Sequence, residues 1–254
     1  MKNPLDSLSD LAKTADAVEQ SWSVGRDEIE ERALFFCDAS TQSATALASA
    51  AKALGIDDNL LAEWSAAIAG SDALGLALRY DMKSIRLYTQ YWVAITARVQ
   101  SGDRTTFPLY RGFKSLTDGL VRRDTYMCSP VCPPSVFWPP MADGFVKFNL
   151  DQDQARAVFR DLSAETAIFT KTDGGGRKSW LTTVRRANID RAALADWLAP
   201  LAERAGGKSI TDAARSSDLV HIAGGEDTIK GTFITFYFES DVQTVLEKLA
   251  VSVS

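Results

Sequence analysis

The stretch that decides the fold is residues 74–92, which read LGLALRYDMKSIRLYTQYW. On both sides of a polar corner at 81–84, apolar residues alternate with small, polar or aromatic ones. A period of two residues is typical of a β-strand that buries one face. The pattern therefore predicts a β-hairpin whose apolar face packs against helices.

The opposite face of this hairpin carries the side chains Arg79, Arg86, Tyr88, Gln90 and Trp92. A face of an antiparallel sheet that is simply exposed to water usually carries Lys, Glu and Thr. Arginine instead offers fixed donors to a phosphate, and aromatic rings pack against apolar or cationic groups. We interpret this face as the lining of a cavity. The alternative is a face that another element or a partner covers.

Two more hairpins are predicted, at 166–186 and at 219–239. Each carries a lysine at the turn or at the start of its second strand, Lys178 and Lys230, as the first hairpin does with Lys83. Each lysine alone is typical of a solvated surface. If the three hairpins share one sheet, however, their ammonium groups can converge on one anionic ligand.

Helices are expected before the first hairpin. The Ala-rich stretch at 43–54 ends at Gly55, and a glycine commonly ends a helix. A second stretch, at 58–68, repeats its apolar residues with a period of about 3.6. Residues 1–70 are therefore predicted to be mainly helical, and no hairpin is visible among them.

The remaining elements complete the predicted fold. Residues 93–99 are predicted as a strand, and residues 129–140 as an ordered loop, because five of the chain's eight prolines lie there. Further helices are expected at 114–123, at 151–162, at 190–204 and from Asp241 onward. The predicted fold class is α+β, with antiparallel hairpins flanked by helices in α-β-β-α units of a single domain spanning 1–254. Closure of the hairpins into a barrel is one arrangement of this class.

Charge and composition limit the classes of function. The chain has 28 Lys and Arg and 33 Asp and Glu, a formal net charge of −5. Because binding of duplex nucleic acid needs a basic face, a nucleic-acid partner is not expected. No apolar run reaches the roughly 18 residues of a membrane-spanning helix. A cytoplasmic protein is expected, because no secretion signal is visible and three cysteines are too few for a disulfide framework.

Common catalytic motifs are absent from the sequence. Residues 174–179 contain glycines and a lysine but lack the spacing and the following helix of a phosphate-binding P-loop. No Gly-x-Ser-x-Gly elbow is present. His221 is the only histidine and lies in a predicted strand, where a structural role is expected. Any mechanism that needs a histidine must use this residue.

Cys128 and Cys132 have a spacing that zinc ligands also use. Because a second pair is missing, buried free thiols are the preferred interpretation. A zinc site completed by Cys37 or His221, and a labile disulfide, are the alternatives. We assign no metal-ligating residues. The sequence identifies no cofactor, and Mg²⁺ is the one candidate that we retain.

Two stretches resemble the ABBA aromatic prenyltransferases. Residues 79–88 (RYDMKSIRLY) are similar to the family's Asp-x-Lys turn and the following strand, which ends in Leu-Tyr. Residues 230–243 are similar to its last strand and closing helix. The resemblance implies a closed antiparallel barrel ringed by helices, the PT barrel. It also implies transfer of a prenyl group from a prenyl diphosphate to an electron-rich aromatic acceptor.

The resemblance further implies roles for individual residues. In this family, inward lysines and arginines hold the diphosphate, and tyrosines shield the allylic cation that forms when it departs. Tyr88 and Tyr237 are the catalytic residues expected from the likeness. The expected substrate-binding residues are Lys83, Arg86, Trp92, Lys178 and Lys230.

A non-catalytic binding or accessory protein is the alternative hypothesis. The same sheet face would then hold a hydrophobic or aromatic ligand or a protein partner, and the loop at 129–140 would be a docking element. The two hypotheses differ in one structural observable. Cations of the sheet should converge in the enzyme and should not converge in the binding protein.

Overall fold

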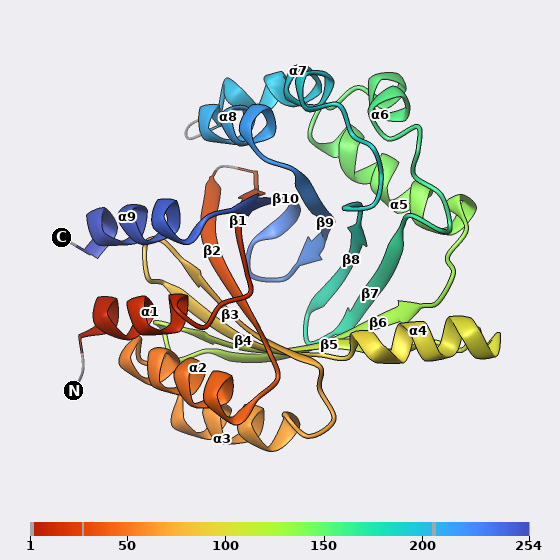
Figure 1. Cartoon of the computed structure of the whole chain (residues 1–254). Coiled ribbons are helices and arrows are strands. Elements are labelled where there is room, and N and C mark those ends of the chain that lie inside the picture. Colours follow the sequence, from red (N-terminus) through yellow and green to blue (C-terminus); the bar gives the residue numbers. More distant parts are fainter. Residues whose placement is uncertain (1–2, 27, 205–206, 254) are drawn as a thin grey trace.

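The computed structural model describes residues 3–26, 28–204 and 207–253. Within them, antiparallel strands close into one barrel, and helices lie outside it (Figure 1). The strands are β1 (Ala17–Val24), β2 (Ile29–Asp38), β3 (Ala73–Arg79), β4 (Ser84–Gln90), β5 (Phe107–Leu116), β6 (Val121–Ser129), β7 (Ile168–Gly174), β8 (Arg177–Thr183), β9 (Leu219–Asp227) and β10 (Gly231–Ser240). The helices are α1 (Pro4–Ala12), α2 (Thr41–Ala53), α3 (Asp58–Ala67), α4 (Trp92–Ser101), α5 (Pro134–Lys147), α6 (Gln152–Val158), α7 (Arg191–Ala202), α8 (Lys208–Ser216) and α9 (Val242–Val253).

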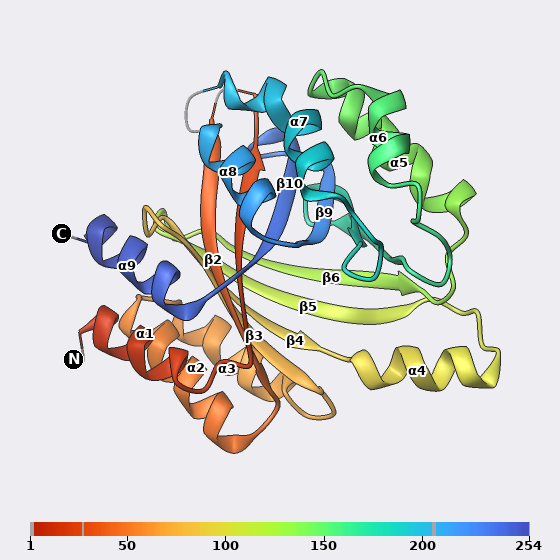
Figure 2. The ribbon, with the colours of Figure 1, turned by 45° about the horizontal axis from the view of Figure 1, so that its top comes forward.

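The barrel has two different ends. Neighbouring strands pair in the order of the chain, and β1 closes the barrel by pairing with β10. Turns join β1 to β2, β3 to β4 and so on at one end, which we call the turn end. Connections that contain helices lie at the other end, the helix end, where α4 extends beyond the strands (Figure 2). Among the described residues, no helix is long and apolar enough to cross a membrane.

The hydrophobic core lies between the barrel and the helices, outside the strands. Leu74, Leu76 and Leu87 point outward and are fully buried in a cluster that includes residues of α1, α2, α3 and α9. A second cluster, beneath α5 to α8, contains Phe145 and Trp197 in edge-to-face contact at 4.8 Å. Because the outward faces carry the core, the inward faces are free to be polar.

The antiparallel α+β class and the closure into a barrel are confirmed, and so are the predicted hairpins. The hairpin predicted at 74–92 is β3 and β4, that at 166–186 is β7 and β8, and that at 219–239 is β9 and β10. Trp92, which the sequence pattern predicts on the polar face of the first hairpin, is instead the first residue of α4. In the first hairpin, the predicted apolar face is the one that packs against helices. The alternation was readable there because each outward position is aliphatic.

The prediction for the N-terminal region is wrong between residues 17 and 38, where β1 and β2 form a hairpin of the barrel. The inward positions of β1 are Glu19, Ser21 and Ser23, and an outward position is Gln20, whose amide donates to Ser240 Oγ at 2.8 Å. Polar residues therefore occur on both faces of the strand. The period of two that identifies a strand is hidden by this composition.

Two short segments also differ from the prediction. Residues 93–99 belong to helix α4, although their β-branched residues favour a strand. The helix ends at Gly102, which has φ 73° and donates its N–H to the carbonyls of the last turn. Residues 114–123 form the end of β5, a turn and the start of β6 in place of a helix.

The proline-rich segment is helical from Pro134 onward, which corrects the prediction of a loop. Proline is tolerated at the first helical position, because its missing N–H would have no partner there. Pro139 and Pro140 lie within the helix, and the residues four positions before them are exposed to water. Burial of Phe137 and other apolar residues spaced along the helix stabilises it despite the prolines.

Candidate active site

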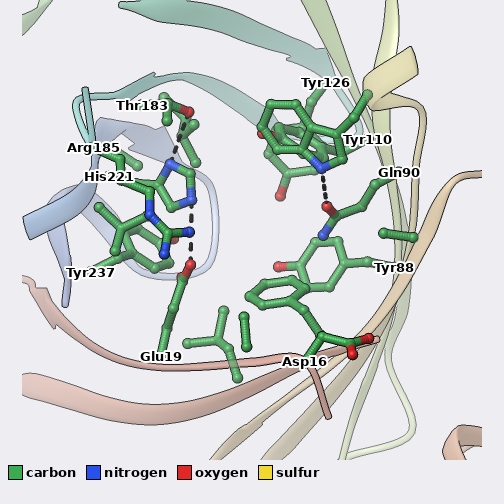
Figure 3. Close-up of a pocket in the computed structure, with 18 of the residues that line it drawn as sticks. Asp16, Glu19, Tyr88, Gln90, Tyr110, Tyr126, Thr183, Arg185, His221 and Tyr237 are labelled. Carbon is green, nitrogen blue, oxygen red and sulfur yellow. Dashed lines mark hydrogen bonds and ion pairs between the residues drawn. The ribbon is translucent and has the colours of Figure 1, made fainter. Parts of the chain in front are cut away.

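The barrel interior is hollow at the helix end. A cavity of about 320 Å³, which we call the aromatic chamber, opens between the strands there. Exposed residues at its rim are Asp16, Asp38 and Arg185. Aromatic rings line much of the chamber, and Figure 3 labels Tyr88, Tyr110, Tyr126, His221 and Tyr237. Phe36, Trp92 and Trp180 also line it.

One wall of the chamber is a series of aromatic rings in edge-to-face contact. The ring centroids of Trp92 and Tyr110 are 5.4 Å apart, and those of Tyr110 and Tyr126 are 5.9 Å apart. Trp92 Nε1 donates to the side-chain oxygen of Gln90 at 2.5 Å, so that the two side chains hold each other. Burial raises the pKa of Tyr110 and of Tyr126, so that both phenols are neutral near pH 7.

The opposite wall carries a carboxylate and the only histidine. His221 Nε2 lies 3.6 Å from Glu19 Oε1, and His221 Nδ1 lies 2.9 Å from Thr183 Oγ1 (Figure 3). The second oxygen of Glu19 is buried and has no hydrogen-bond partner within the described residues. A buried polar atom without a partner is costly. Glu19 therefore lines the chamber with a carboxylate that is only partly satisfied by hydrogen bonds.

Cations gather further along the barrel, toward the turn end. We call this group the cationic belt; it consists of Arg32, Arg86, Lys114, Arg122, Arg177 and Lys230. It surrounds a small cavity of about 40 Å³. The cations of the sheet thus converge inside the barrel. The enzyme hypothesis drawn from the sequence expects this convergence, and the binding-protein hypothesis does not.

Arg86 projects from β4 into the belt and is held from both sides. Its guanidinium lies 2.9 Å from Asp124 and donates to the hydroxyl of Tyr126 at 2.7 Å. Arg177 also faces Asp124, at 3.9 Å. Gly112 gives Arg86 and its neighbour Tyr88 room, because a Cβ at that position would come within 3.2–3.3 Å of both side chains.

Lys230 reaches the belt from the turn before β10. Its Nζ donates to Ser23 Oγ at 2.7 Å and lies 3.6 Å from Glu30. Glu30 also pairs with Arg32 and Arg79. Burial alone would raise the pKa of Glu30, but these cations lower it to about 2. Burial and the nearby Arg32 lower the pKa of Lys230 well below its usual value.

Lys114 lies in a row of cations. It is directly opposite Arg86 of β4 and Arg122 of β6, and like charges opposite each other in a sheet repel. Within the described residues, Arg86 and Arg122 each pair with an aspartate, whereas Lys114 forms no ion pair within 4 Å. Burial, together with Arg86 and Arg32, lowers the pKa of Lys114 to about 7.

The aromatic chamber and the cationic belt meet at a shared boundary. Leu34, Tyr88, Arg177 and Tyr237 line both cavities. Burial raises the pKa of Tyr237, so its phenol is also neutral near pH 7. The site thus changes from aromatic to cationic at the two tyrosines that the sequence analysis assigned a catalytic role.

The seven residues predicted from the sequence divide into two groups. The structure brings Arg86, Tyr88, Trp92, Lys230 and Tyr237 together inside the barrel. Lys83 lies at the turn end, 3.7 Å from Asp81, with 67% of its side chain exposed. Lys178 is exposed on the outer surface of β8, and its inward neighbour is Arg177.

The sequence analysis did not find several residues of the site. Among them are Glu19, Arg32, Lys114 and Arg122. One signal was present: Arg122, Asp124 and Tyr126 alternate along β6 as Arg86 and Tyr88 do along β4. The structure also gives His221 a position in the wall of the chamber, where it contacts both Glu19 and Tyr237.

The three cysteines are free thiols and are buried. Burial raises the pKa of Cys128 to about 12, which keeps it protonated and unreactive near neutral pH. No group of three or more metal-ligating side chains that could hold an ion is found in the part of the chain that the structure describes.

No family model and no curated protein matches the chain. Solved structures do match. A 5-dimethylallyltryptophan synthase from Streptomyces coelicolor is 13% identical, with a TM-score of 0.58 over 94% of this chain and 91% of that chain. NotF in complex with brevianamide F and DMSPP is 10% identical, with a TM-score of 0.52 over 89% of this chain and 80% of the other.

AnaPT from Neosartorya fischeri is 10% identical, with a TM-score of 0.50 over 87% of this chain and 78% of that chain. At identities this low, the likeness concerns the path of the backbone and the arrangement of the strands. The resemblance read from residues 79–88 and 230–243 is confirmed at this level. The chain has the PT-barrel fold of the ABBA aromatic prenyltransferases.

Proposed function

We propose that this protein transfers a prenyl group from a prenyl diphosphate to an electron-rich aromatic acceptor. The observation that carries the proposal is the boundary at Tyr88 and Tyr237, where an aromatic chamber adjoins a cationic belt. An allylic diphosphate has the same division, with an apolar chain joined to an anionic group. The bond that must break would lie at this boundary.

The cationic belt suits the departing diphosphate. When the carbon–oxygen bond of the allylic diphosphate breaks, its electron pair stays on the bridging oxygen and negative charge grows there. Arg86 is a fixed positive group near that position. A diphosphate placed there favours the charged forms of Lys114 and Lys230, whose pKa values are lowered in the empty site. Preorganised charges in a buried site stabilise such a transition state more than water does. In this proposal Lys83 and Lys178 have no contact with the diphosphate, because both are exposed.

The chamber suits the allylic cation. Tyrosine and tryptophan rings attract cations through their faces, and the rings of Tyr88, Tyr126 and Trp92 line the chamber. A phenolate would capture the cation as a nucleophile. Burial disfavours the phenolate at Tyr126 and Tyr237 by raising their pKa, so the rings act as cation-binding faces.

Glu19 and His221 suit the acceptor. A ring carbon of the acceptor forms the new bond to the cation, and the proton on that carbon must then leave to restore aromaticity. His221 lines the chamber and is 3.6 Å from Glu19, so the pair can accept the proton. The Glu19 carboxylate, which lines the chamber, can accept a hydrogen bond from an N–H or O–H of the acceptor.

The similar solved structures support this choice of substrates. One of them is named a 5-dimethylallyltryptophan synthase, after a product in which a prenyl group is attached to an indole-bearing amino acid. Another was solved in complex with brevianamide F and DMSPP. For this chain we propose a dimethylallyl or longer prenyl diphosphate as donor. An aromatic acceptor with a ring N–H or an O–H is favoured, because the Glu19 carboxylate lines the chamber.

The test is incubation of the protein with dimethylallyl or geranyl diphosphate and a set of indole and phenol acceptors. Mass spectrometry should detect an acceptor that has gained one prenyl group. The Arg86→Met variant, whose barrel loses one belt cation, should make less product and bind diphosphate more weakly. Diphosphate binding without any product would favour the non-catalytic binding hypothesis. Absence of diphosphate binding would refute the proposed function.

A further inference from the structure

A third cavity opens at the turn end of the barrel. Its volume is about 470 Å³, and it is lined by residues of the turns that join the strands. Arg26, Thr117 and Ile229 are exposed at its outer rim, whereas Glu30 is buried at its inner end. We call this cavity the turn-end mouth.

The three cavities follow one another along the barrel. The aromatic chamber shares Tyr88 and Tyr237 with the belt cavity. The belt cavity in turn shares Ser84, Lys114 and Lys230 with the turn-end mouth. A molecule held in the belt therefore borders the chamber on one side and the turn-end mouth on the other.

The two open ends of this passage differ in charge. At the rim of the chamber, Asp16 and Asp38 are two carboxylates, and the one cation found there within the described residues, Arg185, pairs with Glu239 at 2.5 Å. The described lining of the turn-end mouth has more cations than carboxylates. Its cations are Arg26, Arg79, Lys83, Lys114, Arg122 and Lys230, and its carboxylates are Glu28, Glu30, Asp118 and Asp227. The lining of the aromatic chamber, taken as a whole, has Arg177 and Arg185 and the carboxylates of Asp16, Glu19 and Asp38. An anion is attracted to the turn end and repelled from the chamber rim.

The positions of the two products after the reaction also favour exit of diphosphate through the turn end. After prenyl transfer, the chamber holds the prenylated aromatic product and the belt holds inorganic diphosphate. A path through the chamber would require the diphosphate to wait for the larger product and then to pass an apolar wall that includes Tyr110 and Tyr126. The turn-end mouth is adjacent to the belt, and most of its lining residues are polar or charged.

We propose that the turn-end mouth is the exit route for inorganic diphosphate, while the aromatic acceptor and its product use the helix end. This inference rests on the proposed function. It gives Lys83 a role that differs from substrate binding: a solvated charge at the rim of the exit. The two products then leave independently of each other.

The experiment places a bulky group at one rim at a time. Ile229→Cys introduces a thiol at a site that is 58% exposed, and a large maleimide is then attached to it. The three natural cysteines are buried and react slowly. Asp38→Cys, labelled in the same way, is the matched control at the chamber rim. Release of radiolabelled inorganic diphosphate is measured by rapid filtration, and its Kd by equilibrium dialysis.

An obstruction on the path, away from the site, slows association and dissociation by the same factor and leaves the Kd unchanged. We expect the label at Ile229→Cys to slow both rates by about tenfold. Association rates among variants of one binding site vary by about this factor or more. The label at Asp38→Cys should leave both rates unchanged. Thr117→Cys, on another exposed turn of the same mouth, should repeat the effect.

The outcomes separate the two proposals. If labelling at Asp38→Cys slows diphosphate release, or if no label does, the exit route is refuted and the proposed function stands. A change in Kd with the label at Ile229→Cys would mean that this label disturbs the binding site itself. If the label at Thr117→Cys leaves the Kd unchanged, the association and dissociation rates of that protein then decide whether diphosphate leaves through the turn-end mouth. If the unlabelled protein binds no inorganic diphosphate, the proposed function itself fails.

Discussion

Lys114 shows how a residue can be unfavourable for the empty protein and favourable for the complex. Its neighbours across the sheet are Arg86 and Arg122, and Arg32 and Glu30 of β2 also act on it. Burial and the cations lower its pKa to about 7 from the usual 10.5. An anion placed beside it reverses the sign of this environment, because it favours the charged ammonium.

We predict that diphosphate affinity depends on pH through Lys114. Below about pH 7 the ammonium is present before binding; above it, binding must include uptake of a proton, and affinity falls. Between pH 6.5 and 8.5 the advantage of the natural protein over Lys114→Met should shrink by about 20-fold, as expected when one group titrates near pH 7. Isothermal titration calorimetry of both proteins with the same ligand measures this ratio. Because the ligand is the same, its own titration cancels, and a constant ratio would contradict the prediction.

Glu19 gives a prediction that separates the acceptor side of the site from the donor side. Glu19→Gln retains the shape of the side chain but removes its charge next to His221. If this pair accepts the proton, the rate of prenyl transfer should fall by about 10²–10⁴-fold, the usual contribution of a general base. The Kd for prenyl diphosphate should stay unchanged, because Glu19 lines the chamber and not the belt. Equal losses in rate and in diphosphate affinity would show that the variant disturbs the whole barrel.

Individual residues of the site were predictable where the side-chain alternation was visible. Arg86 and Tyr88 lie two positions apart on a strand whose other face is aliphatic, so their inward direction could be read. The prediction for Lys178 was wrong by one position, because Arg177 points into the barrel and Lys178 points out. A shift of one residue exchanges the two faces of a strand. In a glycine-rich turn such as 174–176, the sequence gives no means of fixing that phase.

At the scale of elements, one helix supports the most informative strand. Trp64 of α3 is fully buried, and its Nε1 donates to the backbone carbonyl of Tyr88 in β4 at 3.0 Å. The helix thereby holds the strand that carries both Arg86 and Tyr88. This contact joins the outer core to the inner site through the backbone.

We predict that Trp64→Phe lowers the free energy of unfolding by about 1–3 kcal/mol, the cost of leaving a buried hydrogen-bonding group without its partner. Trp138→Phe is the matched control, because Trp138 Nε1 has no hydrogen-bond partner in the described residues. Urea denaturation of both variants measures the difference. A loss for Trp138→Phe as large as that for Trp64→Phe would mean that ring packing, and not the hydrogen bond, dominates.

Elements were predictable from the sequence where composition and period agreed. The helix that starts at Pro134 was not predicted, because its prolines argue against a regular element. Phe137, Met141 and Phe145 recur every four positions, which is a helical spacing. The strand β1 escaped because its inward face is polar and its outward face is mixed. Both failures have one origin: the residues were judged by type, and their faces depend on a barrel that the local sequence does not specify.

At the scale of the whole molecule, closure is the feature that no local pattern contains. The barrel closes where β1 pairs with β10, more than 200 residues later in the chain. Closure creates an interior that is shielded by the strands and open at its two ends, in which polar and charged side chains can be concentrated. The chain has a net charge of −5, yet its interior is cationic. The separation of charge between the surface and the interior follows from the topology.

The interior charge leads to a prediction about metal ions. The belt and the adjoining Arg79 make seven cations, and the buried carboxylates that pair with them are Glu30, Asp124 and Asp227. Arg79 also pairs with Asp81. With Lys114 and Lys230 protonated, three positive charges are therefore in excess, enough to balance a prenyl diphosphate. Mg²⁺ in phosphate sites is usually held by one or two carboxylates that are free to ligate it. Here each of these carboxylates already pairs with an arginine.

We therefore predict that prenyl diphosphate stabilises the protein without a divalent metal. At a ligand concentration of 100 times the Kd, binding to the native state adds about 2.7 kcal/mol, which for a chain of this size corresponds to a rise in Tm of about 5–10 °C. The rise should be the same in excess EDTA as in millimolar Mg²⁺. Inorganic phosphate, which has the charge but not the prenyl chain, is the control and should raise the Tm less. A rise that appears only with Mg²⁺ would mean that the metal supplies charge that the belt does not, and the carboxylates of Asp124 and Asp227 would then have to exchange their arginines for the ion.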